Sequence, residues 1–133
     1  MTNINFLIVD DEDAILETLS SAFDRFKYKY KTMNNTKDAL NIIKNDPYEF
    51  NILLTDINFK NEDMSGISLV SKVKAINKKI TCIAMTGYID RYSLDFCFST
   101  GVRDIILKPF DIHELKKVMD YNICFRERLY KYL

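Results

Sequence analysis

Four short stretches with apolar centres recur along the chain, separated by longer segments of helical periodicity. They are NFLIV at residues 5–9, NILLT at 51–55, ITCIAM at 80–85 and DIILK at 104–108. Their nearly continuous apolar character is expected of strands that helices cover on both faces. A fifth stretch, YKYKTM at residues 28–33, alternates in polarity and predicts a strand near a sheet edge. Strands that alternate with helices in this way predict a parallel sheet.

Five helices are predicted from the spacing of apolar residues and from capping residues at their starts. The third is expected to bury Ile67, Val70 and Val73. The predicted ranges are 14–26, 36–45 with Thr36 as the cap, 66–76, 90–101 with Asp90 as the cap, and 111 to about 133 with Asp111 as the cap. The fold class is therefore α/β, with helices on both faces of a doubly wound, five-stranded parallel sheet.

The composition is that of one soluble globular domain. The 133 residues carry 19 Lys and Arg against 19 Asp and Glu, which gives no electrostatic case for direct binding to nucleic acid or to a membrane surface. No apolar run is long enough to span a bilayer. Cys82, Cys97 and Cys124 lack a metal-binding spacing and are expected to be reduced, which favours a cytoplasmic location.

Chemically active residues follow the predicted strands at their carboxyl ends. Asp10 and Asp11 follow the first strand, Asp56 ends the third, Thr86 follows the fourth and Lys108 ends the fifth. In a doubly wound sheet these ends meet at one edge, where ligands bind. Three converging carboxylates repel one another unless a cation joins them, and their hard oxygen ligands suit Mg²⁺. Each residue alone would be interpreted as a helix cap or a surface residue, so only the joint pattern predicts a site.

Five motifs make the chain similar to a known family. They are LIVDDE (7–12), LLTDIN (53–58), MSG (64–66), AMTG (84–87) and GVRDIILKPF (101–110). Each is weak alone, but together they make residues 4–120 resemble the CheY-like receiver domain of bacterial two-component response regulators. The resemblance implies a flavodoxin-like (βα)5 fold with the strand order 2-1-3-4-5.

The resemblance implies that Asp56 accepts a phosphoryl group from a phosphohistidine on a sensor histidine kinase or a phosphotransfer protein. A carboxylate is already ionised at neutral pH, so this nucleophile needs no general base. A Mg²⁺ cofactor is also implied, bound directly by Asp11, through water by Asp10, and by the backbone carbonyl of Asn58 beside Asp56. The cation would offset the crowding of the carboxylate and phosphoryl oxygens.

The same likeness implies a switch at the ends of the last two strands. Lys108 would pair with one phosphoryl oxygen, and Thr86 would give its hydroxyl to another and draw its loop inward. Gly87 is small and would leave the phosphoryl group accessible. The family holds the bond before Pro109 in the cis form, which would aim the lysine inward. Ile105 stands where receivers usually carry Tyr or Phe, so the usual inward swing of that ring is not expected here.

The loop after the acceptor also departs from the family pattern. Receivers run from the acceptor through a Met-Pro pair to a glycine eight residues on, whereas here Phe59-Lys60 stands at that pair and Gly66 comes two residues later. The enlarged loop carries Glu62 and Asp63, which are interpreted as solvated residues, with tuning of Mg²⁺ or of kinase docking as the alternative.

Two helices carry candidate interfaces. In the fourth helix, Leu94, Cys97 and Phe98 are expected to be buried, which leaves Tyr92 and Phe96 for a partner or for packing against the neighbouring loop. The receiver domain is expected to cover residues 1–120, and residues 121–133 extend the last helix. The apolar residues of this extension indicate a homodimer seam, with a connector to an output domain as the alternative; they include Tyr121, Phe125 and Leu129.

The function predicted is a phosphoacceptor switch that changes partner or self-association, not a turnover enzyme. The alternative is an atypical receiver that binds proteins without phosphate, which Ile105 and the altered loop favour and the intact acids, threonine and lysine oppose. A phosphatase with an aspartate nucleophile would need a second acid where Asn58 stands. A flavin carrier would need a phosphate-binding loop where the acids after the first strand stand.

Overall fold

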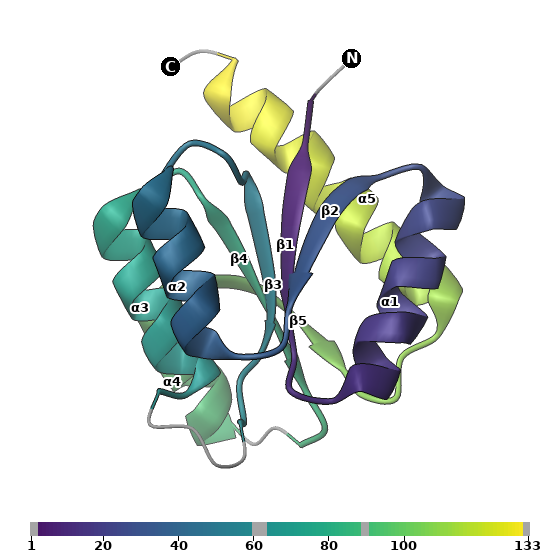
Figure 1. Cartoon of the computed structure of the whole chain (residues 1–133), viewed down its shortest axis with the longest axis horizontal. Coiled ribbons are helices and arrows are strands. Elements are labelled where there is room, and N and C mark those ends of the chain that lie inside the picture. The colour runs from purple at the N-terminus through teal and green to yellow at the C-terminus, as the bar shows by residue number, and fades with distance from the viewer. Residues whose placement is uncertain (1–2, 60–63, 89–90, 132–133) are drawn as a thin grey trace.

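The computed structural model describes residues 3–59, 64–88 and 91–131, with residues 91 and 92 described by their backbone alone (Figure 1). Strands and helices alternate along these residues in the predicted order. The strands are β1 (Asn5–Val9), β2 (Lys29–Met33), β3 (Ile52–Asp56), β4 (Thr81–Thr86) and β5 (Val102–Leu107). The helices are α1 (Asp13–Phe26), α2 (Thr36–Asn45), α3 (Gly66–Ile76), α4 (Arg91–Thr100) and α5 (Ile112–Tyr130). None of these described helices combines the length and the apolar character that crossing a membrane requires.

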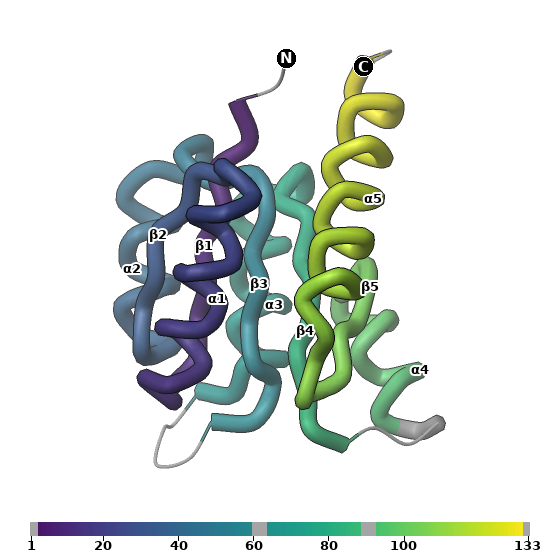
Figure 2. The backbone as a smooth tube through the Cα atoms, turned by 90° about the vertical axis from the view of Figure 1, so that its right-hand side faces the viewer, coloured from purple at the N-terminus to yellow at the C-terminus, as the bar shows by residue number. Residues whose placement is uncertain are grey.

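The sheet is parallel throughout and has the strand order β2-β1-β3-β4-β5. Helices α1 and α5 cover one face, and α2, α3 and α4 cover the other (Figures 1 and 2). This arrangement confirms the predicted doubly wound, flavodoxin-like fold with a long last helix. The strand order reverses between β1 and β3, and ligands bind such sheets outside the carboxyl ends of the strands at that place.

Residues of the central strands face the two helix layers in alternation, because successive side chains of a strand point to opposite faces. In β1, Leu7 and Val9 pack in the core on the α2–α4 side, whereas Phe6 and Ile8 pack on the α1 and α5 side. Every residue of β1 and β3 is buried. A strand covered on both faces is apolar at most positions, as the centres of β1 and β3 are, and the acids at their carboxyl ends lie at the edge of the core.

The start of α2 differs from the prediction by one residue. The cap is Asn35, which has an extended backbone and accepts a hydrogen bond from the backbone N–H of Asp38 through its side-chain oxygen. Thr36 is instead the first helical residue, and its buried hydroxyl donates to the carbonyl oxygen of Met64 at 2.9 Å. The prediction that Thr36 caps this helix was therefore wrong.

The buried faces of α3 and α4 also differ in part from the prediction. Leu69 is buried with Val70 and Val73, whereas Ile67 is only half-buried. In α4 Cys97 is buried as predicted, but Phe98 is 47% exposed, because the next residue along a helix points about 100° away. Leu94 is half-buried, and the predicted Asp90 cap lies outside the described residues.

Strand β5 begins two residues before its predicted start because its pairing with β4 is irregular. Cys82 pairs with Val102 but Ile83 pairs with Asp104, so Arg103 is an extra residue in the edge strand. Its guanidinium lies 4.0 Å from the centre of the Phe125 ring on α5.

Helix α5 starts as predicted and runs along the sheet from the carboxyl ends of the strands toward their amino ends (Figure 2). Asp111 caps it by accepting a hydrogen bond from the backbone N–H of His113. Near the other end, Arg126 donates to the carbonyl oxygen of Lys79 and, at 3.0 Å, to the hydroxyl of Thr81. Residues 121–130 thus continue α5, and this part of the helix contacts the amino end of β4.

Candidate functional site

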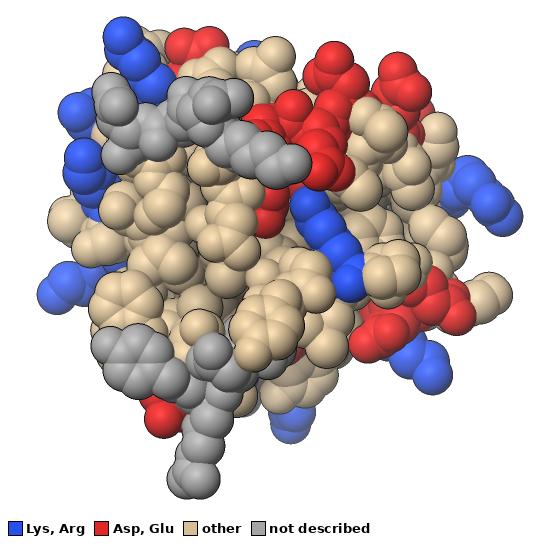
Figure 3. All heavy atoms as spheres, turned by 90° about the horizontal axis from the view of Figure 1, so that it is seen from below, with Lys and Arg blue, Asp and Glu red and all other residues tan. Residues whose placement is uncertain are grey.

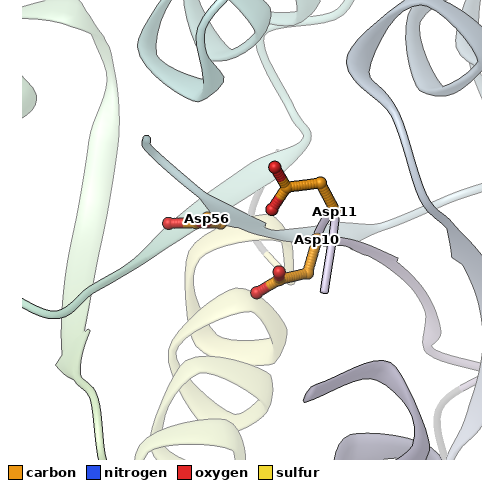
Figure 4. A group of neighbouring side chains, drawn as sticks. All are labelled: Asp10, Asp11 and Asp56. Carbon is orange, nitrogen blue, oxygen red and sulfur yellow. The ribbon is translucent and has the colours of Figure 1, made fainter. Parts of the chain in front are cut away.

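Three carboxylates meet at the carboxyl ends of β1 and β3 (Figure 4). Oxygen atoms of Asp10, Asp11 and Asp56 all lie within 4.8 Å of one another. Asp10 is completely buried and Asp56 is 7% exposed, although both are charged residue types. Seen from this end, the molecule shows a group of acidic side chains with a basic side chain beside it (Figure 3). The structure therefore brings together the three acids that the sequence placed at the ends of two different strands.

Backbone groups fix the two buried acids. The backbone N–H of Asp10 donates to the carbonyl oxygen of Met33 on β2, and its Oδ1 accepts a hydrogen bond of 2.9 Å from the N–H of Glu12. The Oδ1 of Asp56 accepts from the N–H of Asn58 at 3.2 Å. Each carboxylate is thus oriented by an N–H two residues further along its own loop.

Lys108 brings a positive charge to the acids from the end of β5. Its Nζ donates to Oδ2 of Asp10 at 2.6 Å and lies 3.6 Å from Oδ2 of Asp56. Its backbone N–H donates to the carbonyl oxygen of Thr86 at 2.7 Å, which extends the β4–β5 pairing to the site. The bond between Lys108 and Pro109 is cis, as the resemblance implied.

The electrostatics of the site reflect three acids against one amine. Burial raises the pKa of Asp10 and of Asp56, and the hydrogen bonds and the Lys108 charge lower these values only in part. Burial alone would lower the pKa of Lys108, but its hydrogen bond to Asp10 and the nearby carboxylates outweigh burial and raise it. The raised pKa values of Asp10, Asp56 and Lys108 all mean that the site favours additional positive charge, which a bound cation would supply.

The acids fit the ligand preference of Mg²⁺. Mg²⁺ takes oxygen ligands and usually keeps several waters, whereas zinc sites use Cys and His. The three carboxylates supply such oxygens. Cys82 and Cys97 are buried elsewhere in the domain, on the α2–α4 side of the sheet.

Thr86 is buried at the end of β4, but its hydroxyl is engaged within its own loop. It donates to the carbonyl oxygen of Tyr88 at 2.7 Å and accepts from the N–H of Tyr88 at 3.3 Å. A Cβ atom added at Gly87 would have no atom within 4 Å apart from those of its chain neighbours, so the space at Gly87 is open. Ile105 is half-buried and packs with the core on the α2–α4 side.

The loop after Asp56 returns to the end of β3 at Gly66. A Cβ atom added there would lie 1.9 Å from the carbonyl oxygen of Asp56, so only glycine allows this close approach. The N–H of Gly66 donates to the carbonyl oxygen of Ile57. Residues 60–63 of this loop, among them Lys60, Glu62 and Asp63, lie outside the described residues.

The candidate interface residues are mostly accessible. Phe96 on α4 and Leu129 on α5 are exposed, and Tyr121 is 57% exposed. The ring of Phe125 stacks on that of Tyr121 at 6.4 Å and is half-buried beside Arg103. The side chain of Tyr92 lies outside the described ones.

Residues 6–120 match the family model for the response regulator receiver domain. The regulatory protein AtoC of Escherichia coli (strain K12) is 31% identical over 120 residues, which are 90% of this chain and 25% of AtoC. The response regulator SaeR of Staphylococcus aureus is 28% identical over 111 residues, which are 84% of this chain and 46% of SaeR. The chain thus spans a quarter to almost half of the length of these two relatives.

A solved structure gives the same result. The CheY-like receiver domain protein from Methanospirillum hungatei JF-1 is 26% identical and superposes with a TM-score of 0.86, over 94% of this chain and 97% of that chain. These matches agree with the order of the strands. They also agree with the convergence of three acids, a lysine and a threonine at the carboxyl ends of the strands. The chain belongs to the family of response regulator receiver domains.

Proposed function

We propose that this domain is the phosphoacceptor switch of a two-component phosphorelay, which takes a phosphoryl group from a sensor histidine kinase or a phosphotransfer protein onto Asp56. The observation that carries this proposal is the surroundings of Asp56. Asp56 is the last residue of β3. One of its carboxylate oxygens lies within 4.8 Å of oxygen atoms of Asp10 and Asp11, and its Oδ2 lies 3.6 Å from Nζ of Lys108. Membership of the receiver family supports the same role.

In the proposed reaction a carboxylate oxygen of Asp56 attacks the phosphorus of a phosphohistidine. The new O–P bond forms as the P–N bond breaks, and the electron pair of the P–N bond stays with the imidazole. The N–H of Asn58 orients one oxygen of Asp56, and Lys108 faces the other. Positioning of this kind is the main contribution that proteins make to phosphoryl transfer, because little covalent chemistry is left to them.

Asp10, Asp11, Asp56 and the backbone carbonyl of Asn58 are the groups that would hold Mg²⁺. When bound, the cation would offset the negative charge of carboxylate and phosphoryl oxygens as they come together. The raised pKa values of Asp10 and Asp56 support this role, since burial makes their ionised forms costly without a cation.

The switch would operate by an exchange of hydrogen-bond partners. Lys108 would leave Asp10 for a phosphoryl oxygen, and the hydroxyl of Thr86 would leave the Tyr88 carbonyl for another. The open space at Gly87 supports access to the phosphoryl group. Because Ile105 offers no ring to swing, the loop after β4 and the turn at Pro109 would carry the change to α4 and α5.

The output of this switch is proposed to be a change in partner binding or in self-association. Residues 1–120 would form the receiver and residues 121–133 an extension of α5. Exposed Phe96, Tyr121 and Leu129 supply apolar surface for a second copy of the chain. The oligomeric state in the presence and absence of beryllium fluoride, a phosphoryl mimic, tests this part of the proposal.

A receiver that binds proteins without phosphorylation is the second candidate function, favoured by the packing of Ile105 in the core where a mobile ring is usual. Neither candidate is a turnover enzyme. The deciding experiment is incubation with Mg²⁺ and a small phosphodonor, followed by mass spectrometry of the intact chain. The phosphoacceptor proposal expects one added phosphoryl group in the wild type and none in Asp56→Ala. An unmodified wild type would favour the second candidate. Equal modification of both proteins would show that Asp56 is not the acceptor.

A further inference from the structure

The hydroxyl of Thr36 does not cap α2 but makes a hydrogen bond to a distant loop. Asn35 already caps the helix, with its side-chain oxygen accepting from the N–H of Asp38 at 2.8 Å. Thr36 is 1% exposed, and its hydroxyl donates to the carbonyl oxygen of Met64 at 2.9 Å. This bond joins the first residue of α2 to the returning end of the loop that follows Asp56, across 28 positions of the sequence.

The returning end of that loop packs directly against the backbone of Asp56, the proposed acceptor. Met64 lies two residues before Gly66, whose α-carbon is packed so closely on β3 that an added Cβ would lie 1.9 Å from the Asp56 carbonyl oxygen and 2.7 Å from the Ile57 α-carbon. These are backbone atoms that cannot turn aside. A displacement of Met64 would therefore be transmitted through Gly66 to the backbone that carries the Asp56 side chain.

Other contacts also anchor the loop at both of its described ends, and Thr36 adds a hydrogen bond from α2 to the returning end at Met64. The side chains of Phe59 and Met64 pack against the core on the α2–α4 side. Ser65 caps α3 by accepting from the N–H of Ser68 at 3.1 Å, which fixes the helix that follows. To these contacts the Thr36 hydroxyl adds a directional hydrogen bond, which sets the distance between the start of α2 and the Met64 carbonyl.

We propose that Thr36 is a positioning residue for the phosphoacceptor: through Met64 and Gly66 its hydroxyl holds the Asp56 backbone where the carboxylate meets the acids and Lys108. This inference rests on the proposed function of Asp56. It assigns a role to α2, which contributes no side chain to the group of acids. It also accounts for the glycine at position 66, where any side chain would force the acceptor out of place.

The test compares Thr36→Val, which keeps the shape of the side chain and removes the donor, with Thr36→Ser, which keeps the donor. Thr100→Val is the matched control, because its half-buried hydroxyl also donates to a backbone carbonyl, that of Cys97, at the far end of the sheet. The rate of phosphorylation is measured with Mg²⁺ over a range of acetyl phosphate concentrations. Each rate is divided by the folded fraction, obtained from urea unfolding followed by circular dichroism.

The expected result is a maximal rate about 10-fold lower in Thr36→Val, the usual cost of losing a group that orients a reacting one. The acetyl phosphate concentration at half the maximal rate should change little, since Thr36 does not touch the donor. Thr36→Ser should recover most of the rate, and Thr100→Val should match the wild type. If Thr36→Val is too unstable to assay, Thr36→Ala serves in its place.

A maximal rate within twofold of the wild type in the folded fraction of Thr36→Val or Thr36→Ala would overturn the inference. So would a loss of rate that Thr36→Ser shares in full. A wild type that takes no phosphoryl group is a different result, because it contradicts the proposed function of Asp56 before any Thr36 variant is compared.

Discussion

The ammonium group of Lys108 lies 2.6 Å from a carboxylate oxygen of Asp10, in a pocket where the Asp10 side chain is fully buried and that of Lys108 is only 15% exposed. The same ammonium is 1.0 Å further from Asp56, at 3.6 Å. The amine therefore pairs first with an acid of the proposed metal site and only second with the proposed acceptor. Metal binding and the lysine consequently compete for the same carboxylate.

The first prediction follows from this competition. Lys108→Met should bind Mg²⁺ at least about fivefold more tightly than the wild type, because a positive charge beside the acids is removed. Isothermal titration calorimetry at low salt measures the dissociation constant. Lys116→Met, which removes a charge of the same sign from an exposed position on α5, should leave the affinity unchanged. Equal or weaker binding by Lys108→Met would show that the lysine does not oppose the metal.

The second prediction concerns the stability of the metal-free domain. Asp10→Asn should raise the free energy of unfolding at pH 8, because burial raises the pKa of Asp10 and makes its charge costly. Urea unfolding in the presence of a chelator measures this difference. Asp95→Asn, on the exposed side of α4, should have no such effect.

The pH dependence of that gain has a definite sign. The native state keeps the Asp10 proton to a higher pH than the unfolded chain, whose aspartates titrate near about 3.9. Between the pKa of an unfolded aspartate and the higher pKa of native Asp10, ionisation of Asp10 lowers the stability of the wild type as pH rises. Asp10→Asn lacks this contribution. The stabilisation by Asp10→Asn should therefore grow from acidic to neutral pH. A gain that shrinks over this range would contradict the raised pKa.

The third prediction concerns Asp120, whose pKa is shifted in the opposite direction to that of Asp10. Burial opposes its ionisation, but hydrogen bonds from Lys116 at 2.7 Å and from the Tyr28 hydroxyl outweigh burial and lower its pKa. The native state thus releases this proton at a lower pH than the unfolded chain, so the stabilisation is present above about pH 4 and is lost on acidification. Asp120→Asn should destabilise the domain at pH 7 and have a smaller effect at pH 3.5, as followed by urea unfolding. The same loss at both pH values would exclude a lowered pKa.

The fourth prediction concerns the far end of α5. Arg126→Met should lower the free energy of unfolding by about 1 kcal/mol, because the carbonyl oxygen of Lys79 and the hydroxyl of Thr81 lose a charged donor. Hydrogen exchange should quicken over residues 121–130 and remain unchanged in β1. Arg128→Met, which removes an exposed charge from the same helix, is the control. Unchanged exchange in Arg126→Met would mean that other contacts, such as that of the Tyr130 hydroxyl with the Lys79 carbonyl, hold the last turns of α5.

Much of the fold and of the site follows from local sequence because parallel strands share an edge. The buried runs before Asp10, Asp56 and Thr86 had to be strands, and helices between them forced their carboxyl ends together. The same argument brought Lys108 to the acids. No knowledge of tertiary contacts was needed for these predictions.

Other features depended on contacts that the sequence does not encode locally. Asn35 and Thr36 are both good capping residues, and the choice between them was made by the partner available to Thr36 on a distant loop. The early start of β5 required the extra residue at Arg103, which no apolar pattern reveals. The hydrogen bond from Thr86 to the carbonyl of Tyr88 depends on how one loop turns back on itself.

The docking of α5 at Arg126 determines how a movement at the site would spread. The helix has 19 residues and is about 28 Å long at 1.5 Å per residue, so it links the acidic end of the sheet to the opposite one. Its first turn follows the Lys108-Pro109 segment, and its last turns are held by Lys79 and Thr81. A rod fixed at its far end pivots there, and its near end moves most. Helix α5 would then act as a lever that pivots at the turn before β4, with its largest displacement at the end of the sheet that holds Asp56, the proposed phosphoacceptor.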